Sequence, residues 1–194
     1  MLSNAEKFVV GVEVLAETGA TRVGVAIDVP RLERLRHASA VTAVVDKALN
    51  SLAHGRRTRR ELEIRLRRVQ PDAALIREAL DRLEANGVLN DAEVAQGEAS
   101  SRLRRGEAPA RIRQTLRRKG VDARQTEVAL SDAINTDGFD ERAACRQQAD
   151  KRYRALRSLE LTVARRRLMA FLLRRGFSGA VVRDVVRDVT RGDD

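Results

Sequence analysis

The chain has 194 residues, of which 34% are charged and 43% hydrophobic, and its formal net charge is +10. Aromatic residues make up 3% of the chain and tryptophan is absent, which argues against a single-strand-binding protein built on base-stacking rings. The single cysteine excludes an internal disulfide, nothing resembles a secretion signal, and no apolar run is long enough for a membrane span. These features predict a soluble, cytosolic (cytoplasmic) protein.

Residues 9–29 differ from the rest of the chain in the period of their apolar residues. Valine or isoleucine alternates with other residues at 10–14 and again at 23–29, with Glu17-Thr18-Gly19-Ala20 between the two runs. This pattern predicts an N-terminal β-hairpin. Because two strands alone are marginal in water, the hairpin should dock on a helix or on a partner. We expect a short helix or linker at residues 30–36.

From Val41 onward the apolar spacing is helical, and one pattern occurs three times. Each copy reads as an apolar-striped helix, a short turn at 70–71, 120–121 or 176–177, and a second striped helix. The equivalent positions are Leu62, Leu66, Arg68, Ile76, Ala79 and Leu80; Ile112, Leu116, Arg118, Thr126, Ala129 and Leu130; and Leu168, Leu172, Arg174, Val182, Val185 and Val186. A repeat of this length indicates a stacked helical array, because one such unit cannot bury its apolar face alone.

Local signals set the expected helix ends. Thr58 followed by Glu61 forms a capping box, Gly87 and Gly120 are helix stops, and Pro109 is a helix start. We therefore expect a mainly α fold of nine or ten helices in one elongated, curved body. Its predicted parts are the hairpin and short helix at 1–40 and three tandem three-helix repeats at 41–90, 91–136 and 137–194.

The sequence offers few groups for catalysis. His37 and His54 are the only histidines, and no zinc-ligand spacing, phosphate-binding glycine loop or nucleophile elbow is present. His54 has the position of a helix C-terminal cap, and Cys145 has the spacing of a core residue. We expect a protein that is not an enzyme and that needs no metal and no cofactor.

Arginines carry the charge, since 34 of the 38 basic residues are arginine. This excess favours a polyanionic partner, either nucleic acid or an acidic protein surface. Arg68, Arg118 and Arg174 lie six residues after the core positions Leu62, Ile112 and Leu168, so they project at about 120° from the core. The remaining candidates are Arg111 and Arg167 on the same flank, and Arg67 and Arg117 on the opposite flank. In stacked units these side chains would form a basic ridge; the alternative is scattered, solvated charge.

Four segments together resemble the RecX regulators of the bacterial RecA recombinase. They are Arg57-Thr58-Arg59-Arg60-Glu61-Leu62, Gly87-Val88-Leu89-Asn90-Asp91, Gly106 through Pro109 to Lys119-Gly120-Val121, and Phe171-Leu172 with Arg174-Arg175-Gly176-Phe177. The resemblance covers about Ala48 to Val189 and rests on the order and spacing of the segments. Ala108 departs from the family's usual glycine, and Gln70-Pro71 lacks the glycine that ends the equivalent helices.

The resemblance implies a protein that binds in the groove of the RecA filament on DNA and modulates, mostly inhibiting, RecA ATPase, strand exchange and recombination. It implies a place in DNA repair and the SOS response. From the residues, we expect a monomer whose contact with DNA is weak, non-specific and made through phosphates. The alternative is a helix-turn-helix, sequence-specific DNA-binding transcription factor, although no dimerisation element is evident. A third alternative is an adaptor that uses the array to hold another protein.

Overall fold

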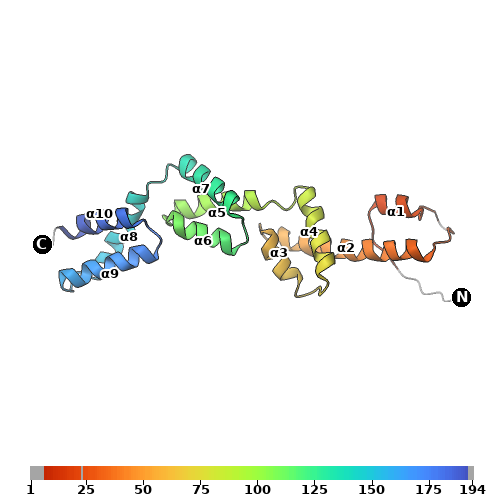
Figure 1. The fold of residues 1–194 in the computed structure, drawn as a ribbon, viewed down its shortest axis with the longest axis horizontal. Coiled ribbons are helices and arrows are strands. Elements are labelled where there is room, and N and C mark those ends of the chain that lie inside the picture. Colours follow the sequence, from red (N-terminus) through yellow and green to blue (C-terminus); the bar gives the residue numbers. More distant parts are fainter. Residues whose placement is uncertain (1–6, 23, 192–194) are drawn as a thin grey trace. The chain divides into compact units, whose positions relative to one another are not determined.

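The computed structural model describes residues 7–22 and 24–191, and in these ranges it contains ten α-helices and no β-strand (Figure 1). The chain divides into two compact units, Met1–Asn90 and Asp91–Asp194. The first unit contains α1 (Val12–Thr18), α2 (Val29–Ala53), α3 (Arg59–Leu66) and α4 (Ala73–Ala85). The second contains α5 (Asp91–Arg104), α6 (Pro109–Arg118), α7 (Ala123–Asp137), α8 (Glu141–Tyr153), α9 (Leu161–Arg174) and α10 (Gly179–Thr190). None of the helices described has the length and apolar character needed to cross a membrane.

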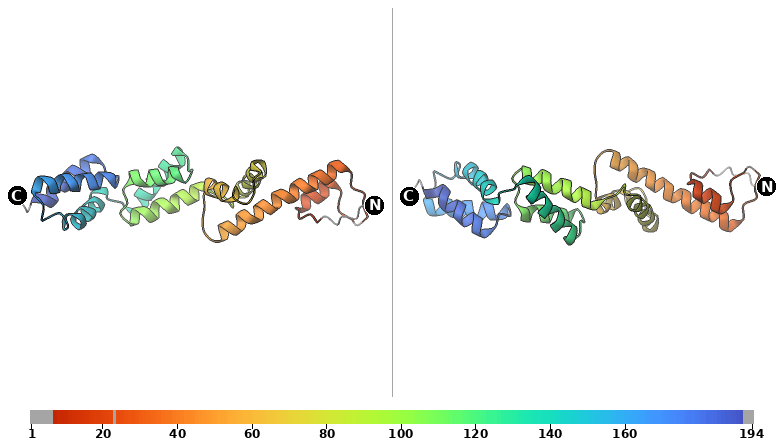
Figure 2. Two further views of the ribbon diagram at one scale, coloured as in Figure 1. Left: turned by 90° about the horizontal axis from the view of Figure 1, so that it is seen from below. Right: turned by 90° about the horizontal axis from the view of Figure 1, so that it is seen from above.

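The predicted N-terminal hairpin is wrong. Residues 12–18 form the helix α1, which packs beside α2 (Figure 2), and residues 25–28 have no regular secondary structure. Val12 is 79% exposed, so the alternating pattern does not build a buried face. The predicted strand residue Val23 lies outside the described residues.

Capping at the start of α2 explains part of this difference. The Asp28 side chain accepts a hydrogen bond from the Arg31 amide at 2.9 Å, and Pro30 lies in the first turn, where its missing N–H is not needed. A single helix therefore begins at Val29 and includes residues 30–36, where we expected a short helix or linker, and continues through Val41, where we expected the first helix of the array.

The first unit has its core between α2, α3 and α4. Val41, Val44 and Ala48 of α2 meet Leu62 and Leu66 of α3 and the apolar face of α4. The predicted capping box at the start of α3 is confirmed: the Glu61 amide donates to Thr58 Oγ1 at 3.3 Å, and the Thr58 amide donates to Glu61 Oε2 at 3.0 Å.

The second unit has two cores, one within α5–α7 and one within α8–α10. Ala108, just before α6, belongs to the core of α8–α10 and so ties the two helix triads together. Gly176 in the α9–α10 turn has φ 87°, and a Cβ there would lie 3.0 Å from the Arg111 amide nitrogen. The end of α9 therefore packs closely against the start of α6, and a Cβ at this left-handed position would push the two apart.

The equivalent apolar positions of the three copies are buried as predicted. The first helix of each pair contributes Leu62 and Leu66, Ile112 and Leu116, and Leu168 and Leu172. The second contributes Ile76, Ala79 and Leu80; Thr126, Ala129 and Leu130; and Val182, Val185 and Val186. Thr126 is the only polar member of these sets, and its fully buried hydroxyl has no hydrogen-bond partner among the described residues. The predicted repeat bounds and the curved body stay predictions.

Candidate polyanion-binding surface

The first copy places Arg68 in the turn that follows α3, with its side chain exposed. In this turn the Val69 and Gln70 amides donate hydrogen bonds to the Leu66 carbonyl, at 3.0 and 2.9 Å. This turn has no glycine, unlike the equivalent turns of the other copies. It needs none, because none of its residues has a positive φ.

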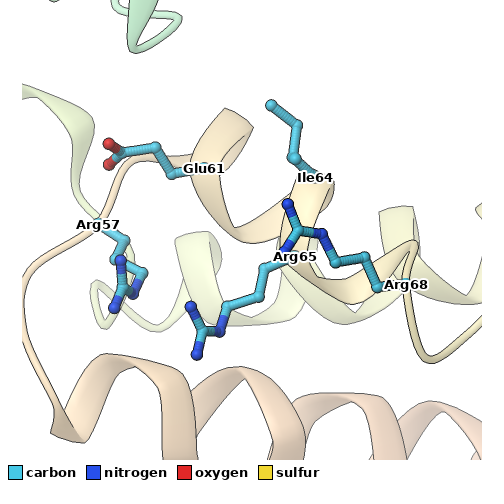
Figure 3. A pocket seen from close by; sticks show the side chains of 5 residues that line it. All are labelled: Arg57, Glu61, Ile64, Arg65 and Arg68. Atoms are coloured by element: carbon cyan, nitrogen blue, oxygen red, sulfur yellow. The ribbon is translucent and has the colours of Figure 1, made fainter.

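Arg68 lines a hollow of about 210 Å³ on the surface of α3, together with Arg57, Glu61, Ile64 and Arg65 (Figure 3). Arg65 and Arg57 extend toward one another in this view. Ile64, which is 51% exposed, places an apolar side chain beside these charges. Three arginines and one exposed isoleucine could receive an acidic or phosphate group next to an apolar one.

Arg67 lies on the other side of α3 and is less available. Its guanidinium donates to Glu63 Oε1 at 2.6 Å, one turn earlier. Nearby, Arg59 holds α3 to α4 by ion pairs of 2.5 Å with Asp81 and with Glu84. The opposite flank of the first copy is therefore partly neutralised by the protein's own carboxylates.

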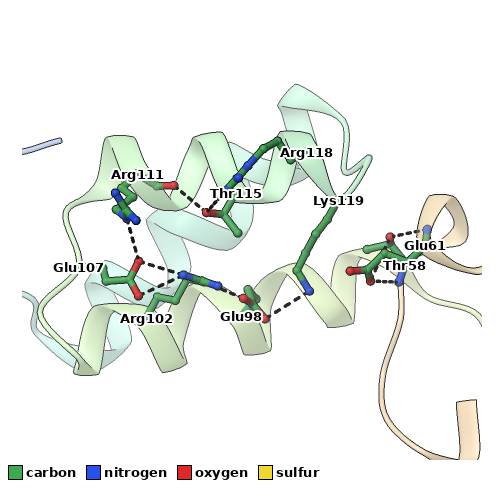
Figure 4. A network of polar contacts seen from close by, with 9 residues as sticks. All are labelled: Thr58, Glu61, Glu98, Arg102, Glu107, Arg111, Thr115, Arg118 and Lys119. Atoms are coloured by element: carbon green, nitrogen blue, oxygen red, sulfur yellow. Dashed lines mark hydrogen bonds and ion pairs between the residues drawn. The ribbon is translucent and has the colours of Figure 1, made fainter. Parts of the chain in front are cut away.

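In the second copy, several basic side chains form ion pairs with carboxylates of the same copy, and Figure 4 shows the network that contains Arg102, Arg111 and Lys119. Arg102 of α5 contacts Glu98 at 2.6 Å and Glu107 at 2.9 Å, and Lys119 reaches Glu98 at 3.7 Å. Arg111 is drawn into the same network, because its Nε lies 3.8 Å from Glu107 Oε2. Burial opposes ionisation of Glu98, but the hydrogen bond from Arg102 and the charge of Lys119 outweigh it and lower the pKa of this carboxyl.

Arg117 and Arg118 are both exposed at the end of α6. Arg118 makes only a long contact with Thr115 Oγ1, at 3.4 Å. Arg117 acts at a distance on Glu127, whose pKa is lowered first by its hydrogen bond with Arg113 and further by the charge of Arg117. Arg118 is held by this one long hydrogen bond, and neither arginine takes part in an ion pair among the described residues.

In the third copy, Arg167 and Arg174 are exposed on α9 and take part in none of the ion pairs found in the described residues. Two residues beyond Arg174, Gly176 meets Arg111, so the start of α6 and the end of α9 lie together. Arg118 lies at the other end of α6. The two units are separate bodies, so the predicted row through all three copies stays a prediction.

The sequence prediction overlooked further exposed basic residues around the end of α8 and in the turn that follows it. The Arg152 and Arg175 guanidinium groups lie 5.4 and 5.0 Å from the centroid of the Phe171 ring, and Arg157 lies 5.9 Å from that of Tyr153. A count of charges by segment would have found this region.

The histidines and the cysteine have structural positions. His54 is the C-cap of α2, and its Nδ1 contacts the Asn50 carbonyl at 2.7 Å, which confirms the predicted cap. His37 Nε2 lies 2.7 Å from Glu78 Oε2. Cys145 is in the core of α8–α10, as predicted, and burial raises the pKa of its thiol to about 11. Within the described ranges, no group of three or more potential metal ligands converges.

Comparisons with known proteins agree on one family. Residues 90–130 match the family model for the second three-helix domain of RecX, and residues 140–186 match that for the third. The chain is 36% identical over 147 residues to regulatory protein RecX of Deinococcus radiodurans, covering 76% of this chain and 68% of that one. It is 33% identical over 156 residues to RecX of Halorhodospira halophila, covering 80% of this chain and 94% of that one.

Solved structures show the same fold. A crystal structure of regulatory protein RecX superimposes with a TM-score of 0.80 at 20% identity and covers 95% of this chain and 92% of its own. A crystal structure of RecX from Lactobacillus salivarius has a TM-score of 0.67 at 24% identity, with 78% and 97% covered. The three-helix domains, the two relatives and the shared fold together establish that this chain belongs to the RecX family.

Proposed function

We propose that this protein binds the RecA filament on DNA and regulates RecA, mainly by inhibiting its ATPase and strand exchange. Membership of the RecX family carries this proposal, since the relatives are regulatory proteins of that name. In this role the protein acts in the cytoplasm as a monomer, in recombination, DNA repair and the SOS response.

The arginines at equivalent positions give the proposal a physical basis. Arg68, Arg118 and Arg174 are exposed while the core positions six residues earlier are fully buried. Repeated cations on a helical array can contact successive subunits of a filament, because a filament also presents equivalent surfaces at regular intervals. Bridging neighbouring RecA subunits would block entry of a second DNA or hold the filament in a less active state.

The direct test is RecA ATPase on single-stranded DNA with the parent and with the triple variant Arg68→Glu, Arg118→Glu and Arg174→Glu. Each reversal at a partly desolvated contact should cost about 1–3 kcal/mol. Three together should raise the concentration needed for inhibition by more than about a hundredfold. The melting temperature should hardly change, because these side chains are exposed and outside the cores.

A matched control reverses three other exposed arginines, Arg77, Arg105 and Arg124, and so changes the net charge equally. Inhibition by this control should stay close to that of the parent. If the Arg68, Arg118 and Arg174 variant inhibits as well as the parent, the row is solvated charge and the contact with RecA lies elsewhere. If the parent itself leaves RecA ATPase unchanged, the proposed function is wrong.

A further inference from the structure

The net charge of this chain is concentrated in one short segment. Residues 151–175 contain nine basic residues and one acidic residue, so this segment carries +8 of the total +10. The basic residues are Lys151, Arg152, Arg154, Arg157, Arg165, Arg166, Arg167, Arg174 and Arg175. They belong to the end of α8, the turn after it, the helix α9 and its C-cap.

The single carboxylate of the segment, that of Glu160, accepts hydrogen bonds from backbone amides. Glu160 is the N-cap of α9, and it accepts hydrogen bonds from the Thr162 and Val163 amides at 3.0 and 3.2 Å. The hydrogen bond from the Thr162 hydroxyl, followed by those from the two amides, lowers the pKa of Glu160. Glu160 therefore stabilises the start of the helix, and it takes part in no ion pair among the described residues.

Most of the basic side chains in this segment lack an internal counter-charge. Across the described ranges, no ion pair involves the exposed residues Lys151, Arg152, Arg154, Arg166, Arg167, Arg174 or Arg175. The second copy differs. Its paired residues are Arg102, Arg104, Arg111, Arg113 and Lys119. In α5–α7, five of the nine basic residues are thus in ion pairs, whereas the seven residues named above, at the end of α8 and on α9, are in none within the described ranges.

Two of these arginines lie beside the ring of Phe171. Arg152 from the end of α8 and Arg175 from the end of α9 both lie over its ring, at 5.4 and 5.0 Å from the centroid. Cation–π attraction holds each guanidinium in place, while the two like charges repel each other. An anion beside them would offset this repulsion, and the ring already limits the freedom that the arginines would lose on binding.

The surroundings favour nucleic acid over an acidic protein as the source of that anion. Among the large apolar side chains exposed in the described residues, only Leu173, at 46%, lies in this segment. Protein interfaces have an apolar centre depleted of charge, whereas interfaces with nucleic acid are polar and strongly positive. Arginine also matches the forked geometry of a phosphate.

We propose that the end of α8, the α8–α9 turn and α9 form a binding surface for the phosphate backbone of DNA, to which Arg152, Arg154 and Arg175 contribute contacts. Arg152, Arg154 and Arg175 lie outside the predicted row of Arg68, Arg118 and Arg174, so they test this surface separately from that row. In the regulator proposed above, this surface is the contact with DNA, and DNA binding can be measured without RecA.

The test measures binding of the full chain to a labelled single-stranded oligonucleotide and to the matching duplex, by fluorescence anisotropy over a range of salt concentrations. The variant is Arg152→Gln, Arg154→Gln and Arg175→Gln. Each lost phosphate contact should weaken binding about tenfold near 0.1 M salt. The slope of log affinity against log salt should become shallower by about 0.7 per contact for the single strand and about 0.9 for the duplex.

The control variant is Arg77→Gln, Arg105→Gln and Arg124→Gln, which removes the same charge elsewhere and should keep the parent's slope. The single variant Arg154→Gln separates loss of binding from a folding defect, because the exposed Arg154 is not one of the two arginines that lie over Phe171. This variant should bind DNA about tenfold more weakly with an unchanged melting curve.

If the triple variant keeps the parent's affinity and slope, or if the parent does not bind either oligonucleotide, the proposal is overturned. The same holds if the triple variant loses only RecA inhibition, because the surface would then face protein. Since the oligonucleotide assay contains no RecA, its failure leaves the proposed regulation of RecA open.

Discussion

Replacing Thr126 with valine should stabilise this protein. Thr126 occupies the position taken by Ile76 in the first copy and by Val182 in the third, and all three side chains are buried. Its hydroxyl has no hydrogen-bond partner among the described residues. Valine has the same branched shape with a methyl group in place of the hydroxyl, so Thr126→Val removes an unpaired polar group without leaving a cavity.

The expected gain follows from the cost of burying that group. A buried hydroxyl without a partner costs about 1–3 kcal/mol on mutational scales, because the same hydroxyl is hydrated in the unfolded state. We expect the free energy of unfolding to rise by about 1–2 kcal/mol. In a chain of this length each kcal/mol should raise the melting temperature by about 2–4 °C. Urea denaturation followed by circular dichroism at 222 nm measures the change directly.

Thr115 provides a control of the same chemistry and the opposite sign. Its hydroxyl is also buried, but it donates to the Arg111 carbonyl at 3.0 Å and lies 3.4 Å from Arg118 Nη2. Thr115→Val should therefore lower the free energy of unfolding by about 1 kcal/mol. If both variants lose stability, the Thr126 hydroxyl has a partner in solution and the reasoning is refuted.

Two other substitutions test local features of the second unit. In urea denaturation, Gly176→Ala should lower the free energy of unfolding more than Gly138→Ala does. Both glycines have positive φ, but only at position 176 would the new Cβ lie 3.0 Å from the Arg111 amide nitrogen. Equal losses of unfolding free energy would mean that the α9–α10 turn does not press on α6. Glu98→Gln should make the free energy of unfolding depend less on pH in the acidic range. A carboxyl whose pKa is lowered in the folded state stabilises the protein above its unfolded-state pKa, and it loses that contribution as the pH falls through its folded-state pKa. Parallel curves of unfolding free energy against pH for parent and variant would contradict this.

The helical array could be predicted because its signal is redundant. Each apolar position is supported by neighbours three and four residues away and by the same position in the other copies, so one polar exception such as Thr126 does not break the pattern. The N-terminal segment has no such support. Its alternation at 10–14 and 23–29 is short, and the Asp28 cap with Pro30 favours a helix from Val29. The capping signal was the stronger one, because it satisfies backbone groups directly.

The arginine candidates could be predicted to be exposed, because spacing from Leu62, Ile112 or Leu168 fixes the direction in which a side chain leaves its helix. Two of their ion pairs could also have been read from the sequence, since Glu63–Arg67 and Glu107–Arg111 have the i,i+4 spacing of neighbours on one helix. The pair Arg113–Glu127 joins α6 to α7, and spacing along one helix contains no information about such a contact.

The acidic residues therefore decide what each copy can do with its arginines. We expect equivalent basic side chains, such as Arg118 of α6 and Arg174 of α9, to leave their helices in the same direction. In the second copy, Glu98, Glu107 and Glu127 form internal ion pairs with nearby cations. In the third copy, the lone carboxylate within residues 151–175 caps a helix, and most of the basic residues there take part in no ion pair within the described ranges. Because exposed ion pairs contribute little to stability, carboxylates can be lost from one copy at low cost to folding, and the same helical unit can change from a structural element into a binding surface.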